Sequence, residues 1–146
     1  MTRVVLDSSA VLAMLWAEPG ASLVSDSAAT AMISSVNIAE IVARFLDRNF
    51  SLEETSIVVG DLKPEIMPFD EAQAILSGML RPKTQHRGLL LGDRACLALA
   101  MREKATVLTA DRAWSDLDLG APLPLRSCSL RRVRQPPRRR RGHAES

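Results

Sequence analysis

The stretch RVVLDSSAVLAMLW, residues 3–16, predicts a strand followed at once by a helix. Residues 3–6 form a short β-branched run, which is typical of a buried strand. Ser8 and Ser9 are favourable helix caps, and residues 10–16 continue as an apolar helix. Because a strand that leads directly into a helix is the repeating unit of α/β proteins, this stretch sets the expected fold class.

The same alternation of strands and helices continues along the chain. Strands are expected at residues 31–33, 66–67 and 106–108, helices at 21–28, 36–48, 52–62, 71–80 and 93–103, and a helical turn at 113–117. Ser35 is expected to cap the helix at 36–48, and residues 82–91 to form an irregular connection. This pattern predicts an α/β domain with a short, mostly parallel sheet and helices on both faces.

The composition is that of one soluble globular domain: 146 residues, 47% of them hydrophobic, 25% charged, with a formal net charge of +2. Cys96 and Cys128 lie far apart without a Cys/His cluster, so neither a disulfide framework nor a structural zinc site is indicated. Asp7 interrupts the apolar N-terminal stretch, which is far shorter than the ~20 residues that span a bilayer. We expect a cytoplasmic protein with no signal peptide, membrane helix or membrane partner.

The small net charge hides two unlike parts. Residues 1–125 contain 11 Lys and Arg against 16 Asp and Glu, giving −5, whereas residues 126–146 contain 8 against 1, giving +7. We therefore predict a folded domain at 1–125 and a basic Arg/Pro-rich extension at 126–146. Leu123, Leu125 and Leu130 could form an edge strand, and residues 131–146 are expected to be a disordered tail.

Acidic residues follow two of the predicted strands. Asp7 comes directly after the first strand, and Asp111 follows residues 107–108 after a short Thr109-Ala110 turn. In open α/β sheets, ligands bind outside the carboxyl ends of the strands, so both carboxylates are candidate site residues. Each aspartate could instead simply cap the next helix, which is the commoner explanation for a single aspartate at such a position.

Two further carboxylates are expected near the same edge of the sheet. Asp93 begins an apolar helix, where the helix dipole favours an anion, although capping alone would explain it. Glu40 shares a predominantly apolar helical face with Val36 and Ala43, where an unpaired carboxylate is costly. The alternative for Glu40 is a capping box formed with Asn37.

Together, four carboxylates at one edge of a sheet indicate a site for a hard cation. Oxygen ligands without a His/Cys cluster favour Mg²⁺ or Mn²⁺, and the matching chemistry is metal-assisted phosphodiester hydrolysis. The chain contains no G-x-x-x-x-G-K-[ST] loop, no G-x-G-x-x-G after a strand and no G-x-S-x-G, which weighs against P-loop, dinucleotide-binding and serine hydrolase chemistry.

Four motifs carry a family resemblance: VLDSSAVL (5–12), SSVNIAEI (34–41), GLLLGDRACLALA (88–100) and VLTADRAW (107–114). In this order, from Val4 to about residue 119, they resemble the PIN-domain ribonucleases, and among these the VapC toxins of bacterial type II toxin-antitoxin pairs. The resemblance implies a PIN-like α/β/α sandwich that binds Mg²⁺ or Mn²⁺ and cleaves RNA. It also implies a homodimer that a VapB-type antitoxin inhibits.

The resemblance assigns a role to each candidate site residue. Asp7 and Asp93 match the principal metal ligands, Glu40 and Asp111 match the carboxylates that complete the pocket, and Thr109 matches a polar position beside it. Arg94 and Arg112 each follow a pocket carboxylate and could contact the scissile phosphate, balance the acidic cluster or simply be surface charges.

The chain departs from the family pattern at two places. Leu90 replaces a residue that is often small and polar, and the C-terminus continues into the Arg/Pro extension where the family has a short apolar strand. Two other functions stay open at this point. The protein could bind RNA through its basic extension, or serve as an antitoxin-bound regulator, without cleaving RNA in either case.

Overall fold

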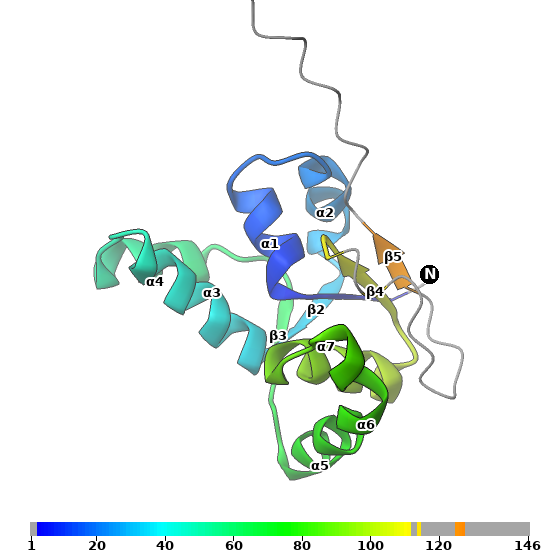
Figure 1. Cartoon of the computed structure of the whole chain (residues 1–146). Coiled ribbons are helices and arrows are strands. Elements are labelled where there is room, and N and C mark those ends of the chain that lie inside the picture. The colour runs from blue at the N-terminus through cyan, green and yellow to red at the C-terminus, as the bar shows by residue number, and fades with distance from the viewer. Residues whose placement is uncertain (1–2, 112–113, 115–124, 128–146) are drawn as a thin grey trace, which may run out of the picture.

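Five short parallel strands form the centre of the structure. A computed structural model describes residues 3–111, 114 and 125–127 of the chain (Figure 1). The strands in these residues are β1 (Val4–Leu6), β2 (Ala31–Ser34), β3 (Glu65–Met67), β4 (Thr106–Thr109) and β5 (Leu125–Ser127). Their order across the sheet is β3-β2-β1-β4-β5, and every neighbouring pair is parallel. The expected parallel sheet is confirmed.

Helices cover both faces of this sheet. They are α1 (Ser8–Leu15), α2 (Ala21–Ala28), α3 (Ser35–Asp47), α4 (Leu52–Gly60), α5 (Glu71–Met79), α6 (Arg81–Thr84), the 3₁₀ turn η1 (Gln85–Arg87) and α7 (Leu91–Glu103). Val5 packs against Leu97 of α7 in one core cluster, whereas Leu6 packs with Val11 of α1 and Ile41 of α3 in the other. Because successive strand residues face opposite sides, the sheet has two cores, and the expected α/β/α sandwich is confirmed.

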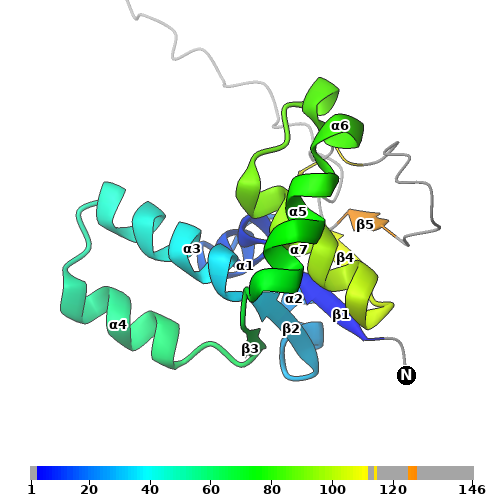
Figure 2. The ribbon, with the colours of Figure 1, turned by 90° about the horizontal axis from the view of Figure 1, so that it is seen from below.

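The strand register brings three strand ends to the same level. Leu6 of β1 pairs with Ile33 of β2 on one side and with Leu108 of β4 on the other. Asp7 and Thr109 therefore lie at one edge of the sheet, next to the first turns of α1 and α3. Figure 1 shows α1 and α2 on one side of the strands and α7 on the other, and Figure 2 shows α3 and α4 extending away as a pair.

Three helices begin at other residues than expected. Asp7, rather than the two serines after it, caps α1, and its Oδ1 accepts a hydrogen bond from Ala10 N at 2.8 Å. Ser34 caps α3 in place of Ser35. Both caps have extended backbone, so the last extended residue of each strand–helix junction becomes the N-cap. Asp93 lies within the first turn of α7, which begins two residues earlier.

The expectation of an irregular connection at residues 82–91 is wrong. The segment contains most of α6, all of η1 and the first residue of α7, and η1 is closed by Gly88, whose φ of +68° suits glycine. Pro82 lies in the first turn of α6, where its missing N–H group leaves no helical hydrogen bond unmade. Proline therefore starts a helix here instead of only ending the previous one.

Several expectations fall wholly or partly outside the described residues. The predicted turn at 113–117 is described only at Trp114, and the tail at 131–146 is not described. β5 provides an edge strand at residues 125–127 that crosses the expected boundary between 125 and 126. The division into domain and extension stays a prediction. Within the described part of the chain, no helix is long and apolar enough to cross a membrane.

Candidate active site

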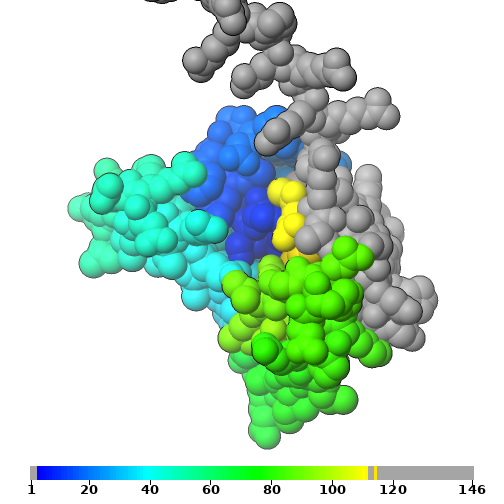
Figure 3. All heavy atoms as spheres, viewed as in Figure 1, coloured from blue at the N-terminus to red at the C-terminus, as the bar shows by residue number. Residues whose placement is uncertain are grey.

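Four carboxylates meet at the carboxyl edge of the sheet. Asp7 joins β1 to α1, Glu40 lies in the second turn of α3, Asp93 in the first turn of α7, and Asp111 just beyond β4. Their charges influence one another: Glu40 and Asp111 both act on Asp93, and Asp93 acts on Asp7. In Figure 3 the segments that carry them, coloured blue, cyan, green and yellow, meet on the face shown.

Asp7 is the most enclosed of the four, with only 3% of its surface exposed. Besides Ala10 N, it accepts hydrogen bonds from Ser9 Oγ at 2.8 Å and from Thr109 Oγ1 at 2.6 Å. Burial nevertheless raises the pKa of Asp7 to about 6, and the charge of Asp93 adds to this rise, while the hydrogen bonds oppose it. Asp7 is thus both the cap of α1 and a pocket carboxyl group whose ionised form is disfavoured by burial.

Asp93 is half-buried, and its charge interacts with those of the three other carboxylates. Its Oδ2 accepts a hydrogen bond from Leu90 N at 2.8 Å, at the start of α7. Burial raises the pKa of Asp93, and the nearby charges of Glu40 and Asp111 raise it further, against the opposing effect of the Leu90 hydrogen bond. The crowding of negative charge is therefore centred on Asp93.

Glu40 reaches this pocket for a different reason from the one its sequence context indicates. Ala43 is exposed, and the buried side of α3 contains Asn37, Ile41 and Phe45, so Glu40 is half-buried at the rim of that side. The alternative capping box is not formed, because the side chain of Ser34 caps α3. The apolar surroundings expected at Ala43 and the alternative capping box are therefore both wrong, whereas the position of Glu40 beside Asp93 agrees with the prediction.

A polar network that the sequence pattern does not predict surrounds Glu40. Asn37 Nδ2 donates to Glu40 Oε1 at 2.9 Å, to Ser8 Oγ at 3.1 Å and to the carbonyl oxygen of Gly92 at 3.1 Å. Ser8 Oγ also donates to Glu40 Oε1. The only available signal was a set of small polar residues at strand–helix junctions, which capping explained equally well.

Thr109, the last residue of β4, lies beside the pocket, in agreement with what the family resemblance implies. It is buried, its hydroxyl donates to Asp7 Oδ2, and the same oxygen accepts a hydrogen bond from Asp111 N at 3.0 Å. Ser9 Oγ lies 3.3 Å from it. Thr109 therefore links the end of β4 to the start of α1 and orients Asp7.

Arg94 does not lie where a phosphate contact would require. It is only 9% exposed, and it donates from Nε to the carbonyl oxygen of Ser77 at 3.1 Å and from Nη1 to that of Leu89 at 3.2 Å. One step along a helix turns a side chain by about 100°, so Arg94 faces α5 while Asp93 faces the pocket. Its charge still opposes the raised pKa of Asp93. Arg112 lies outside the described residues.

The donor chemistry of this site suits a hard divalent cation. The carboxylates offer only oxygen ligands, and their mutual repulsion, which helps to raise the pKa values of Asp7 and Asp93, is what a bound cation relieves. The geometry is less complete: among residues 3–111 and 114, no three Asp, Glu, His or Cys side chains form a ready-made metal cluster. Charge and ligand type thus fit a divalent cation at this edge of the sheet.

A comparison with family models identifies the fold family: the model of the PIN domain matches residues 4–119. The chain belongs to the PIN domain family. PIN domains are generally nucleases, so membership supports an enzyme that hydrolyses nucleic acid. The family resemblance drawn from the four sequence motifs is confirmed.

Solved structures with the same fold come from toxin-antitoxin complexes. A DNA-bound VapBC from Salmonella typhimurium is 17% identical with a TM-score of 0.64, covering 88% of this chain and 100% of that one. VapBC-5 from Mycobacterium tuberculosis is 22% identical with a TM-score of 0.59, and VapBC2 from Rickettsia felis, bound to a promoter DNA fragment, is 20% identical with 0.58; each covers 86% of this chain and 98% of its own. A comparison with curated protein sequences gives no match. At these identities the structures show a shared PIN fold.

Proposed function

We propose that this PIN domain is a metal-dependent endoribonuclease that acts as a VapC-type toxin in the bacterial cytoplasm. The observation that carries the proposal is the convergence of Asp7, Glu40, Asp93 and Asp111 at one sheet edge, with the pKa values of Asp7 and Asp93 raised. Carboxylates held this close without a compensating cation are costly, which indicates a site that functions with one bound.

In this proposal Asp7 and Asp93 hold Mg²⁺ or Mn²⁺, and Glu40 and Asp111 complete the pocket, directly or through water. A divalent cation at such a site supplies an activated water and stabilises charge on a phosphate oxygen. The protein contributes orientation: Thr109 and Ser9 fix the Asp7 carboxylate, and the Leu90 backbone fixes that of Asp93. Arg112 is proposed as a contact to the scissile phosphate.

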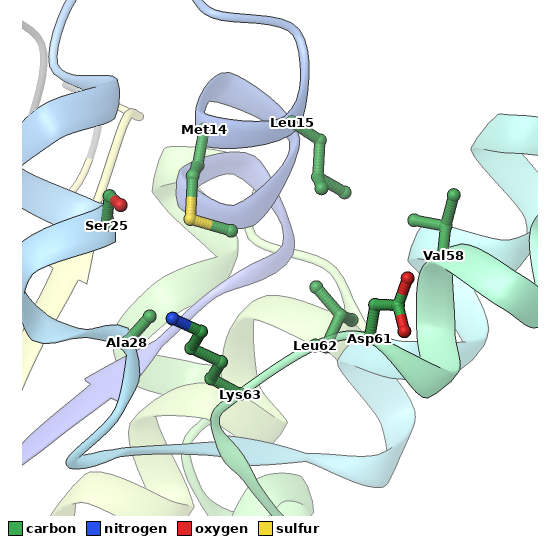
Figure 4. A pocket seen from close by; sticks show the side chains of 8 residues that line it. All are labelled: Met14, Leu15, Ser25, Ala28, Val58, Asp61, Leu62 and Lys63. Carbon is green, nitrogen blue, oxygen red and sulfur yellow. The ribbon is translucent and has the colours of Figure 1, made fainter.

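The VapBC complexes that share this fold support an antitoxin partner, and the binding site that we propose for it is a groove on the other side of the domain from α7. It has a volume of about 260 Å³ and is lined by Met14, Leu15, Ser25, Ala28, Val58, Asp61, Leu62 and Lys63 (Figure 4). The Lys63 side chain extends toward Ala28, among otherwise mainly apolar neighbours. We propose that a VapB-type antitoxin inserts apolar side chains here, with an acidic residue against Lys63. Leu15→Glu should abolish co-purification with the antitoxin, and unchanged binding would contradict this location.

A homodimer is also part of the proposal. Ile75 and Met79 on α5, together with Leu90 and Leu91 at the start of α7, are exposed in the single chain. Burial of such side chains against a second copy would stabilise a dimer. Light scattering of the wild type and of Met79→Lys tests this, with a dimer expected for the former and a monomer for the latter. An unchanged mass would contradict the use of this surface.

RNA cleavage tests the proposed activity. Purified protein should cut RNA with Mg²⁺ or Mn²⁺, lose activity in EDTA and lose at least 100-fold as Asp7→Asn or Asp93→Asn. Asp26→Asn, which changes an exposed carboxylate of α2, is the matched control and should retain full activity. Cleavage that persists in EDTA or in both pocket variants would refute the metal-nuclease mechanism.

The alternative function is a catalytically silent module that binds RNA or an antitoxin. It requires RNA binding, or antitoxin binding, by a protein that leaves RNA intact under every metal condition. Removal of residues 131–146 separates the contribution of the basic tail: loss of RNA affinity with intact cleavage would indicate recruitment through that tail.

A further inference from the structure

A single buried amide joins the first turns of three helices at the candidate active site. Asn37 of α3 is 1% exposed, and its Nδ2 donates to Ser8 of α1, to Glu40 on its own helix and to the carbonyl oxygen of Gly92 in α7. Ser8 and Gly92 are 29 and 55 residues away from Asn37 in the sequence. One side chain thus ties together the three helices that carry Asp7, Glu40 and Asp93.

The orientation of this amide is determined by its neighbours. Nδ2 faces a carboxylate oxygen, a backbone carbonyl and a hydroxyl that itself donates to Glu40, so a flipped amide would place its oxygen against acceptors. The cost of the observed orientation is that Asn37 Oδ1 is buried without a hydrogen-bond partner among the described residues. A buried carbonyl left unpaired costs about 1–3 kcal/mol, so Asn37 is not optimised for stability alone.

Gly92 provides the space that Glu40 occupies. A Cβ atom built at position 92 would overlap the carboxyl carbon and both carboxylate oxygens of Glu40, so a larger residue there would displace this side chain. The Glu40 carboxylate therefore lies directly over the first turn of α7, where the helix dipole favours an anion. This placement brings its charge next to Asp93.

The two donors that hold Glu40 act on the same oxygen. Asn37 and Ser8 both donate to Oε1, whereas Oε2 takes part in neither hydrogen bond. Fixing one oxygen of a carboxylate orients the other, which is how outer-sphere hydrogen bonds usually tune a metal ligand. The arrangement has the form of a support for Glu40 and not of a helix cap, because Ser34 already caps α3.

We propose that Asn37 is a positioning residue which, with Ser8 and Gly92, fixes the Glu40 carboxylate beside Asp93 and thereby sets the affinity of the pocket for a divalent cation. The inference rests on the proposed metal-dependent function of the same pocket. Asn37 acts through Glu40, so its effect on cation binding must vanish when Glu40 is removed.

A double-mutant cycle on Mn²⁺ binding tests this coupling. Isothermal titration of the full chain should give Mn²⁺ affinities about 10–100-fold weaker for Asn37→Leu than for the wild type. The double variant with Glu40→Ala should bind no more weakly than Glu40→Ala alone. Gln73→Leu is the matched control, because it removes a buried amide that donates to the carbonyl oxygen of Ala98, away from the pocket. Equal losses from Asn37→Leu in both backgrounds, or an equal loss in Gln73→Leu, would overturn the inference.

A second variant covers the case in which Asn37→Leu does not fold. Ser8→Ala removes the other donor to Glu40 from a half-buried position, and it should weaken Mn²⁺ binding by a smaller factor in the same Glu40-dependent manner. A Ser8→Ala loss that persists in the Glu40→Ala background would contradict the shared support.

A measurement without metal separates this inference from the proposed function. Gly92→Ala should lower the Tm of the protein while Glu40 is present, because the new methyl group displaces the carboxylate. In the Glu40→Ala background it should raise the Tm, since alanine is the better helix former. The crystal structure of the Asn37→Leu or Ser8→Ala variant should show the Glu40 carboxylate moved off Gly92. Failure of the wild type to bind Mn²⁺ would refute the metal site, whereas an unmoved Glu40 in these variants would refute the positioning role by itself.

Discussion

The first turns of α1 and α7 both present an aspartate to the same pocket, but they are built differently. The N-cap of α1 is the pocket aspartate itself, Asp7. This residue is almost completely buried and accepts hydrogen bonds from a backbone N–H and two hydroxyls. α7 begins with Leu90, which is 71% exposed and offers no side-chain cap. The Asp93 carboxylate accepts a hydrogen bond from Leu90 N, which is one of the two hydrogen bonds of a capping box. Arg94 holds the same turn by donating to the carbonyl oxygens of Ser77 and Leu89.

This difference shows two ways of holding a charged ligand at a helix start. At α1 the Asp7 carboxylate is held by burial and hydrogen bonds. Burial disfavours its ionised form, so its pKa is raised to about 6. At α7 the ligand is more accessible, and its position depends on neighbouring residues instead of its own burial. Substitutions at the start of α1 should therefore mainly change how the free energy of unfolding depends on pH. Substitutions at the start of α7 should mainly change the stability of that helix.

The largest effect is expected for Arg94→Met, which removes the anchor of α7. The carbonyl oxygens of Ser77 and Leu89 would lose a charged donor in a buried position, so the free energy of unfolding should fall by about 3 kcal/mol. Urea denaturation measures this change. Arg44→Met, at an exposed position on α3, should change it by less than about 0.5 kcal/mol. A loss below about 1 kcal/mol for Arg94→Met would mean that α7 does not depend on this anchor.

The next effect concerns the buried charge at α1. The pKa of Asp7 is raised from 3.8 to about 6 by burial, so the folded metal-free protein binds more protons than the unfolded chain between these values. Its stability should therefore rise as the pH falls through 6 and level off below about 4, with a contribution of about 3 kcal/mol from this group.

Asp7→Asn should remove most of this pH dependence and stabilise the metal-free protein at pH 7.5. Chemical denaturation at a series of pH values measures the slope. Asp26→Asn, on the exposed face of α2, should leave it unchanged. A wild-type stability that falls on going from pH 7 to 5 would contradict the burial of an ionised Asp7.

The smallest effect should come from completing the cap of α7. Leu90 has the extended backbone of an N-cap residue, and the hydrogen bond from its N–H to Asp93 is already in place. Measured in the Met79→Lys background, where the proposed dimer surface containing Leu90 and Leu91 is not buried, Leu90→Ser would add an acceptor to the first turn of α7 and should stabilise the protein by about 1 kcal/mol. Leu91→Ser, one residue further and inside the helix, should not. Equal effects of the two changes in thermal unfolding would contradict the capping argument.

The sequence predicts the parts of this site that follow from strand topology. Asp7 directly follows one strand and Asp111 follows another after a short turn, and parallel strands bring such ends to one edge, so the proximity of these two residues can be inferred from the sequence. Proline at position 82 misleads for a physical reason, because it is unfavourable inside a helix yet well suited to a first turn.

Contacts between distant segments could not be predicted in the same way. The sequence pattern places Glu40 on an apolar face of its helix, whereas in the structure it lies at the rim of the buried side of α3. Its supports, Asn37 and the space over Gly92, depend on how α3 packs against α7. The place of Arg94 beside Asp93 in the sequence predicts a pocket residue, whereas the helical rotation between adjacent residues directs its side chain toward Ser77 of α5.

The central claim is that the carboxylates at this sheet edge form one cation site, and Mn²⁺ titration of the wild type against Asp93→Asn tests it most directly. At pH 7.5 the wild type should bind Mn²⁺, at pH 5 it should bind at least 10-fold more weakly because protons compete at Asp7 and Asp93, and Asp93→Asn should lose binding while staying folded. Equal Mn²⁺ affinity in the wild type and in folded Asp93→Asn would contradict the account.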